Sequence, residues 1–380
     1  MRILVISVSD LGRDPRVNRQ IRHLGRKHEV TCIGLEDPGV PGVAFHRIPG
    51  NPAWSTAFNG LLLLLRRYRL LSTTSPSLQR LRSEFRGRRF DLIIANDTDT
   101  LSFASAVRNG ARLVFDAHEY APREFEHSLS WRLLFQGYQR HLYRRYLGGC
   151  DRVLTVSDGI AEEIGREFGV RPTVMTNASE YRALAPGPVD PDHIRLVHHG
   201  GVNPQRRLER MIEMMDHLDE RFSLDLMLVS SPRHAAYFDR LRALAAGRPD
   251  VRIVPPVPMG EIASAINAYD IGLYILEPST FNERHALPNK LFEFVQARLA
   301  IAIGPSVEMA RVVREHDLGV VAETFSPEAM ADRIGGLTVE EIEHYKRQSH
   351  RAASVLSSEK NLEILDGILE DLDRHAPRPA

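Results

Sequence analysis

The feature that most constrains this chain is a regular alternation of short apolar runs with longer segments of helical periodicity. Several of the runs are apolar throughout, as in parallel strands that are covered on both faces. A strand followed by a helix, repeated along a chain, predicts a doubly wound parallel sheet. In the first half we predict helices at 14–26, 130–147 and 158–168, and strands at 2–7, 29–35, 44–48, 91–96, 112–116, 152–156 and 172–176.

The alternation is interrupted at residues 181–192, where three prolines and a glycine show no periodicity. It then resumes with predicted strands at 194–198, 223–229, 251–254, 271–275, 299–303 and 319–322. A chain of 380 residues suits two domains of ~150–200 residues each. We therefore predict two Rossmann-like α/β domains, at 1–182 and 193–355, followed by a C-terminal helix and tail at 356–380 whose helix packs on the first domain. Because ligands of such sheets bind beyond the carboxyl ends of the strands, we expect an interdomain cleft.

Composition excludes several classes of protein. The formal net charge is zero, so no overall field favours nucleic acid. Cys32 and Cys150 lie in separate apolar runs, which favours two buried thiols, and no spacing typical of metal ligands occurs. The start, MRILVIS, enters a strand without the apolar segment of a secretory signal. We expect a cytoplasmic protein, since no run approaches the ~20 apolar residues of a membrane-spanning helix.

Two segments of the second half have the residues of an anion site. Gly200 and Gly201 follow a strand and permit close approach of a ligand to the backbone, and Arg206 and Arg207 suit phosphate oxygens. The alternative is a glycine turn beside two solvated arginines. Neither a Walker loop nor an intact G-x-G-x-x-G is present.

The second of these segments begins a helix with Pro288, Asn289 and Lys290, where backbone N–H groups would meet an anion. Glu293 lies a little over one turn further and could accept hydrogen bonds from the two hydroxyls of a ribose. The alternative is that Lys290 and Glu293 form an i,i+3 ion pair on the surface, worth a few tenths of a kcal/mol.

In the first half, His118 and Glu119 follow a strand and therefore lie in the ligand zone. We expect Asp116 to hold this loop through backbone N–H groups. Asp14 and Pro15 suit the N-cap and first turn of a helix, so Asp14 has a structural role. Gly12 and Arg13, in the same turn, remain available to an acceptor molecule.

The segment 61–89 contains eight arginines and one glutamate, interleaved with leucines. Such a basic amphipathic stretch is typical of contact with an anionic lipid surface. Three more arginines, Arg140, Arg144 and Arg145, are spaced for one face of a helix. In both cases the alternative is a solvated basic face over a leucine core.

Taken together, these motifs resemble those of the retaining GT-B glycosyltransferases of family 4. The resemblance covers nearly the whole chain and is carried, in order, by Asp14–Val17, Asp116–Glu119, Thr155–Ser157, Gly200 to Arg206, Leu287–Glu293, and Gly304 to Glu308.

The resemblance implies an enzyme that moves a hexose from a UDP- or GDP-sugar to a glycan or a lipid-linked acceptor, with retention of configuration. It implies that Arg206 and Lys290 stabilise the diphosphate, that Glu293 holds the ribose and that His118 contacts the donor sugar. No metal and no cofactor are expected, because cations and helix N–H groups would supply the positive field.

Two positions depart from the family pattern. The first carboxylate of the common Glu-x7-Glu motif would fall at position 285, where this chain has His285. The common Gly-Arg pair is Gly200-Gly201, and Arg206 stands where a lysine is usual. These departures leave two alternatives open: a non-catalytic GT-B subunit that binds a nucleotide or a partner, and a nucleotide-sugar epimerase.

Overall fold

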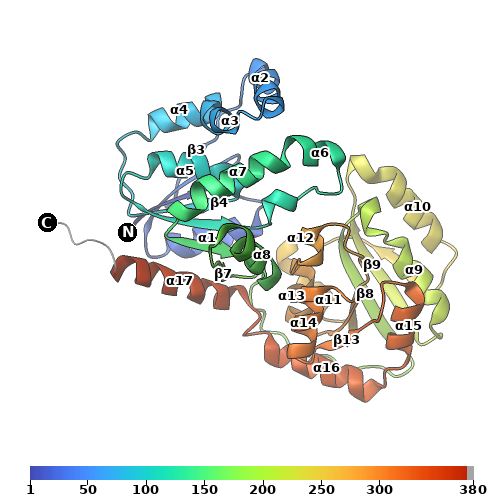
Figure 1. Cartoon of the computed structure of the whole chain (residues 1–380). Helices are drawn as coiled ribbons and strands as arrows, with labels where there is room; N and C mark the ends of the chain where they lie inside the picture. Colours follow the sequence, from blue (N-terminus) through green and yellow to red (C-terminus); the bar gives the residue numbers. More distant parts are fainter. Residues whose placement is uncertain (375–380) are drawn as a thin grey trace. The chain divides into compact units, whose positions relative to one another are not determined.

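The computed structural model describes residues 1–374, which form two compact units (Figure 1). The first unit contains residues 1–176 and 280–283 and the C-terminal segment from Leu362 onward. The second contains residues 177–279 and 284–361. Each unit is a parallel sheet with helices on both faces, so the prediction of two Rossmann-like α/β domains is confirmed.

The sheet of the first unit has seven parallel strands in the order β3-β2-β1-β4-β5-β6-β7. Every strand predicted in this half is present, and the ends differ by two residues at most. The strands are β1 (Arg2–Ile6), β2 (Glu29–Gly34), β3 (Ala44–Arg47), β4 (Leu92–Asn96), β5 (Arg112–Ala117), β6 (Arg152–Thr155) and β7 (Thr173–Val174).

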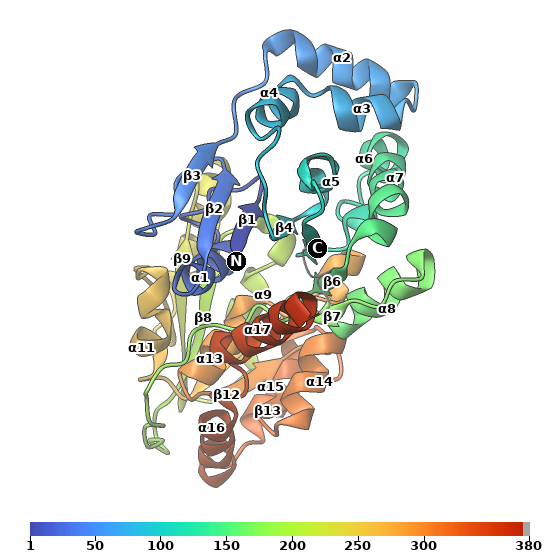
Figure 2. The ribbon, with the colours of Figure 1, turned by 90° about the vertical axis from the view of Figure 1, so that its left-hand side faces the viewer.

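Alternate side chains of β1 point to the two faces of this sheet. Ile3 and Val5 pack against α1 (Pro15–Gly25) and the C-terminal helix α17 (Ser358–Arg374), which lie together on one face (Figures 1 and 2). Leu4 and Ile6 face a second core, which is completed by helices on the opposite face. The remaining helices of this unit are α2 (Ala53–Leu64), α3 (Tyr68–Thr74), α4 (Pro76–Glu84), α5 (Leu101–Val107), α6 (Leu129–Leu134), α7 (Gln136–Tyr146) and α8 (Asp158–Phe168).

Local sequence signals account for the ends of these helices. Asp14 caps α1, because its Oδ1 accepts a hydrogen bond of 3.1 Å from the Val17 N–H, and Pro15 occupies the first turn. The structural role predicted for Asp14 is therefore confirmed. The helix predicted at 130–147 is instead divided at Phe135 into α6 and α7. Near the break, the Tyr68 hydroxyl packs against Gly137, where a β-carbon would lie only 2.5 Å away.

The second unit has six parallel strands in the order β10-β9-β8-β11-β12-β13. They are β8 (Ile194–Gly201), β9 (Phe222–Val229), β10 (Val251–Val254), β11 (Ile271–Tyr274), β12 (Ala300–Ile303) and β13 (Gly319–Val321). The helices are α9 (Glu209–Met214), α10 (Ala235–Ala245), α11 (Ile262–Ile266), α13 (Asn289–Gln296), α14 (Val307–Glu315), α15 (Pro327–Gly335) and α16 (Val339–Ala352), while the short helix α12 (Phe281–Arg284) belongs to the first unit except for its last residue. Of these, α9, α10 and α15 cover one face, and α11, α13 and α14 cover the other.

The proline-rich segment is bound to the second unit at its start. The buried Arg298 donates hydrogen bonds to the carbonyls of Arg182 and Gln296, and the Tyr181 N–H donates to Glu359. These bonds satisfy a guanidinium that would be costly to bury without partners.

Two expectations about the chain as a whole can be compared with the structure. Both cysteines are free thiols, as predicted. Within residues 1–374, no helix combines the length and the apolar character needed to cross a bilayer.

A substitution in α17 can test how much its packing on β1 and α1 stabilises the first unit. Leu365 is fully buried, so Leu365→Ala should lower the free energy of unfolding by about 2–5 kcal/mol. Both tryptophans of the chain, Trp54 and Trp131, lie in this unit, so their fluorescence during urea unfolding reports on it. Glu370→Ala, an exposed change on the same helix, is the control and should change stability little.

Candidate functional site

In both sheets the strand order reverses beside the first strand. In the first unit the chain builds outward from β1 to β2 and β3, then returns to place β4 on the other side. The second unit repeats this with β8, β9, β10 and β11. At such a point the flanking connections run to opposite faces, which leaves the carboxyl ends of the two strands uncovered. The candidate residues lie at these two points.

At the end of β8, two cations meet over a pair of glycines. Gly200 has a φ of +134°, and a β-carbon built on it would lie 2.5 Å from Nζ of Lys290 and 3.9 Å from Nη1 of Arg206. Arg206 also donates a hydrogen bond of 3.1 Å to the Gly201 carbonyl. The backbone conformation therefore favours glycine here, and a β-carbon would also force the end of the Lys290 side chain to move.

The charges at this point repel one another. Burial, and then the positive charge of Arg206, lower the pKa of Lys290 to about 8, and Glu293 offsets this only in part. Within the described chain, Lys290 Nζ has neither a hydrogen-bond partner nor an ion-pair partner. A multivalent anion would relieve the repulsion and satisfy the lysine.

Glu293 is buried beside this pair of cations, with 8% of its surface exposed. The alternative of a surface ion pair between Lys290 and Glu293 is therefore wrong. Oε2 of Glu293 lies instead 3.2 Å from Nε2 of His199, although the angle is not that of a hydrogen bond. Burial, and then the charge of Lys290, lower the pKa of His199 to about 3, so this imidazole is neutral.

Helix α13 presents its amino-terminal end at the same place. Pro288 is the N-cap, with extended backbone, and Asn289 and Lys290 form the first turn. The N–H groups of this turn have no partner within the helix and add a partial positive charge. Asn289 and Lys290 therefore lie at the predicted helix start, whereas Pro288 precedes the first turn as the N-cap, and Glu293 of this helix points to β8.

The two neighbouring arginines differ. Arg207 lies in the left-handed conformation, with a φ of +47°, and its Nη1 is 3.8 Å from Glu277. Arg210 binds the same carboxylate at 2.9 Å. The first α-helix after β8 begins only at Glu209, after a 3-10 turn at Pro204–Arg206. Only Arg206 of the two thus faces Gly200.

His285 lies next to a buried carboxylate. Its Nδ1 is 3.3 Å from Oε1 of Glu308, in the first turn of α14, and Arg311 donates to the other oxygen at 3.2 Å. Glu308 is 3% exposed. A carboxylate is therefore present beside the position where the family pattern has one, although it comes from another helix.

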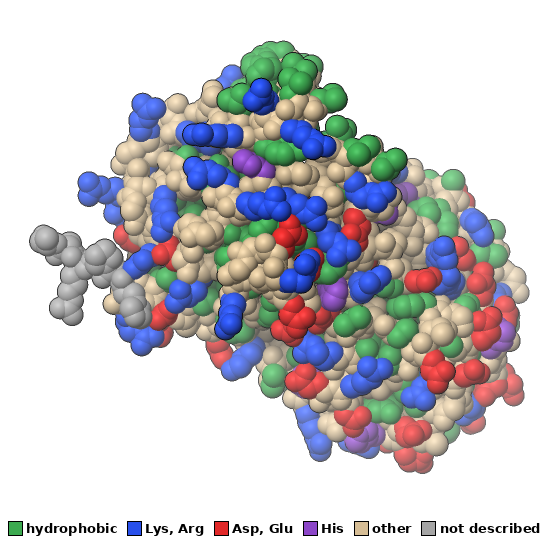
Figure 3. All heavy atoms as spheres, viewed as in Figure 1, with side chains coloured by type: hydrophobic (Ala, Val, Ile, Leu, Met, Phe, Trp, Pro, Cys, Tyr) green, Lys and Arg blue, Asp and Glu red, His purple; other side chains and the backbone are tan. Residues whose placement is uncertain are grey.

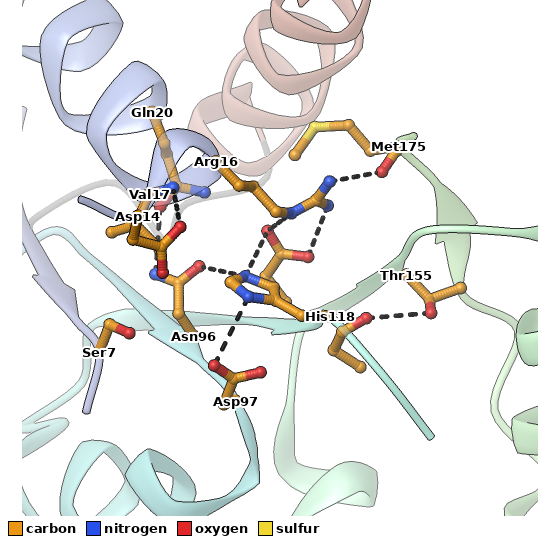
Figure 4. Close-up of polar contacts among 12 residues, drawn as sticks. Ser7, Asp14, Arg16, Val17, Gln20, Asn96, Asp97, His118, Thr155 and Met175 are labelled. Carbon is orange, nitrogen blue, oxygen red and sulfur yellow. Dashed lines mark hydrogen bonds and ion pairs between the residues drawn. The ribbon is translucent and has the colours of Figure 1, made fainter. Parts of the chain in front are cut away.

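In the first unit, His118 is held between β4 and β5 (Figure 4). Its Nε2 lies 3.2 Å from Oδ1 of Asn96, and its Nδ1 lies 3.5 Å from Oδ2 of Asp97. Asp97 has a φ of +63°, which is uncommon for a residue with a side chain and indicates a backbone held by its surroundings. The imidazole is 18% exposed and so remains accessible to a ligand.

Asp116 does not hold its loop through backbone N–H groups, and that prediction is wrong. It accepts two hydrogen bonds from Arg16, at 2.8 and 3.0 Å, inside the protein. Burial raises the pKa of this carboxyl, but Arg16 more than compensates and keeps the pKa below its usual value. Arg16 also donates to the carbonyls of Met175 and Thr176, and so joins α1, β5 and the end of the first unit.

Gly12 and Arg13 lie in the turn between β1 and α1. The N–H of Gly12 donates to Asp10 at 3.1 Å, and the Arg13 side chain is 90% exposed, with Nε 3.5 Å from Asp10. Both positions are compatible with contact to a second molecule.

Sequence reasoning missed Asn96, Asp97 and His199. A signal for the first two existed, since polar residues follow directly after the buried run Leu92–Ala95 at the reversal of strand order. No residues within 1–374 are grouped in the manner of a metal site, with three or more His, Cys, Asp or Glu side chains.

Comparisons with known proteins give one family match and several matches of fold. Residues 16–179, less than half of the chain, match the model of Glycosyltransferase Family 4. No curated protein matches.

Solved structures share the fold over almost the whole chain. HepE of Anabaena in complex with UDP has a TM-score of 0.72 at 11% identity and covers 98% of this chain and 100% of its own. Sucrose-phosphate synthase of Thermosynechococcus elongatus has a TM-score of 0.74 at 12% identity, with coverage of 98% and 99%. An Escherichia coli trehalose-6-phosphate protein bound with UDP-2-fluoro glucose has a TM-score of 0.67 at 12% identity and full coverage of both chains, 100% each. At this identity the likeness shows the fold.

The state of Lys290 can be measured directly, because the chain has only four lysines. After reductive ¹³C-methylation, the NMR signal that disappears in Lys290→Arg should titrate with a midpoint near 8. Inorganic pyrophosphate should raise this midpoint, since an anion favours the charged amine. A midpoint near the usual lysine value, or one that pyrophosphate does not move, would contradict the anion site.

Gly200→Ala should abolish pyrophosphate binding measured by calorimetry, because the new methyl group displaces Lys290 and the φ of +134° is unfavourable for alanine. The matched control is Gly247→Ala in the same unit, where a β-carbon meets no atom within 4 Å. Equal affinities for the two variants would rule out the proposed role of Gly200.

Proposed function

We propose that this chain is a glycosyltransferase that transfers a hexose from a UDP- or GDP-sugar to a glycan or lipid-linked acceptor, with retention of configuration. The observation that carries the proposal is the unpaired Lys290 beside Arg206 over Gly200, at the switch point of a Rossmann-like sheet. The family match of residues 16–179 and the UDP complexes of structural neighbours support it.

In this mechanism the second unit binds the diphosphate. Lys290 and Arg206 neutralise the negative charge that develops on the leaving phosphate, and the N–H groups at the start of α13 add to the field. These groups are in place before the reaction, so no reorganisation is needed when the glycosidic bond breaks. The nucleotide-sugar is a substrate, and neither a metal nor a cofactor enters the proposal.

The remaining residues orient the donor. Glu293, buried beside His199, accepts the ribose hydroxyls, while Gly200, Gly201, Pro288 and Asn289 let the backbone approach the phosphates. We assign His285 and its partner Glu308 to the sugar end of the donor. His118, held by Asn96 and Asp97, is assigned to the donor sugar as well.

Gly12 and Arg13 are assigned to the acceptor side, where the exposed guanidinium can meet a polar molecule. The proposal includes a cytoplasmic location with peripheral contact to the inner face of a membrane through the arginine-rich segment 61–89.

A panel of nucleotide-sugars tests the function. A donor should raise the melting temperature, since it binds only the folded chain, and should be hydrolysed slowly when no acceptor is present. Stabilisation without any hydrolysis or transfer would favour the non-catalytic subunit, and a new nucleotide-sugar formed without acceptor would indicate an epimerase. If no nucleotide or nucleotide-sugar stabilises the protein, the proposal is wrong.

Two adjacent arginines provide a matched pair of variants. Arg206→Ala should weaken donor binding by about 1.5–3 kcal/mol, the range for a hydrogen bond to a charged group. Arg207→Ala should change it little, because Arg207 is 59% exposed and faces Glu277. Calorimetric titration with the donor found in the panel measures both. Equal losses in the two variants would remove Arg206 from the phosphate site.

A further inference from the structure

Exposed apolar side chains are concentrated in two segments of the first unit. Among the described residues, eighteen large hydrophobic side chains are exposed, and ten of them lie between residues 54 and 135. We call these ten the α2–α6 apolar face: Trp54, Phe58, Leu61, Leu64, Leu65, Leu70, Phe125, Leu129, Leu133 and Phe135. Soluble chains scatter such residues singly, and a contiguous group indicates a binding surface.

Helix α2 presents its apolar side outward. It buries only Ser55 and Leu62. Trp54, Phe58, Leu61 and the C-cap residue Leu65, at spacings of four, three and four residues, share an exposed stripe beside this buried side. Leu61 and Leu65 are 53% and 59% exposed. A helix that packs only on its own domain would have the reverse pattern.

Helix α6 continues this surface. It has no buried residue, and Leu129 and Leu133, one turn apart, are 62% and 63% exposed. The segments that follow α2 and α6 pack together, since Tyr68 of α3 contacts Tyr138 and His141 of α7. Figure 2 shows α3 directly above α6 and α7, and Figure 3 shows the hydrophobic side chains running from α2 toward α6.

Arginines predominate around this face, and the two carboxylates that lie beside it in sequence, Glu124 and Glu126, flank Phe125. Residues 38–83 and 127–150 contain ten arginines and no aspartate or glutamate, in a chain whose formal net charge is zero. Six of these arginines are exposed and make no ion pair within the described chain: Arg66, Arg67, Arg69, Arg80, Arg132 and Arg145.

The positions of the arginines show that only part of the segment 61–89 lies beside the α2–α6 apolar face. Arg88 and Arg89 line a hollow with Arg2 and Glu29, at the amino-terminal edge of the sheet, and Arg88 lies 3.8 Å from Glu84. Arg66, Arg67 and Arg69, in contrast, come directly after the end of α2 in the sequence.

We propose that the α2–α6 apolar face inserts into the interfacial region of an anionic lipid bilayer, with the surrounding arginines at the level of the headgroups. Aromatic and leucine side chains enter the acyl boundary, and guanidinium groups bind phosphates, which is the pattern of interfacial helices. The excess of arginine over acidic residues at this surface favours anionic lipid over a second copy of this chain, because two such faces would repel each other. The inference rests on the proposed function, because it deepens the membrane contact proposed there for segment 61–89, and a lipid-linked acceptor would be presented at this surface.

Vesicle binding by the whole chain tests the proposal. Sedimentation with vesicles of equal parts phosphatidylcholine and phosphatidylglycerol should recover the protein, and vesicles of phosphatidylcholine alone should recover far less. In Trp131→Phe, the remaining Trp54 should shift its fluorescence to shorter wavelength when anionic vesicles are added. Absence of binding, or binding without this shift, would overturn the insertion.

Variants separate the two parts of the surface. Replacing Leu61 and Leu65 by serine should reduce the partition constant more than tenfold, and both sites are exposed enough for the fold to tolerate the change. Arg66→Gln and Arg67→Gln should each reduce it about fivefold, and more at low salt than at high salt. Leu244→Ser, an exposed leucine on α10, is the control.

Two further readouts keep the inference distinct from the proposed function. Donor binding in solution, without vesicles, should be unchanged in the Leu61/Leu65 variant. Light scattering should show the same mass for this variant and the parent chain. A dimer that dissociates on serine substitution would assign the face to a contact between copies, and would overturn the lipid proposal whatever the donor results are.

Discussion

The structure depends on the reversal of strand order, which occurs once in each of the two sheets. In each unit the sheet grows to one side of the first strand and then to the other, so that the connections leave in opposite directions between β1 and β4 and between β8 and β11. Backbone groups at these strand ends cannot be covered by the unit's own helices. Polar residues and a glycine lie at these ends: Asn96 and Asp97 in the first unit, and His199 and Gly200 in the second.

Two cations show how differently charge is used in the two units. The guanidinium of Arg16 is buried and compensated by Asp116 and by two carbonyls, so removing one partner would leave an unpaired charge inside the first unit. Lys290 is compensated only in part, by Glu293, and Arg206 adds a second positive charge beside it. The first arrangement stabilises the fold. The second is tolerated at a cost to stability and is suited to a ligand that brings negative charge.

Charge is also segregated on the surface. The chain is neutral overall, yet the segments around α2, α6 and α7 contain arginines and no carboxylates. The same segments contain several exposed leucines, and α2 and α6 contain the two tryptophans of the chain. A neutral net charge therefore excludes a field over the whole protein but does not exclude a local one, and the local one coincides with the largest group of exposed apolar side chains.

Much of this protein was determined by the sequence itself. The strands, the capping of α1 by Asp14 and the start of α13 directly after Pro288 follow from periodicity, caps and proline, which act over a few residues. These local signals also brought His118, Gly200, Lys290 and Glu293 to strand ends and helix starts. Only the tertiary structure decided which of them meet. Arg206 and Arg207 are neighbours in sequence, yet one faces Gly200 and the other Glu277. Asp116 binds an arginine one hundred residues away, and the outward side of α2 joins that of α6 through packing of α3 on α7. The reason is physical: strand order and helix packing set the contacts between distant segments, and local propensity carries no information about them.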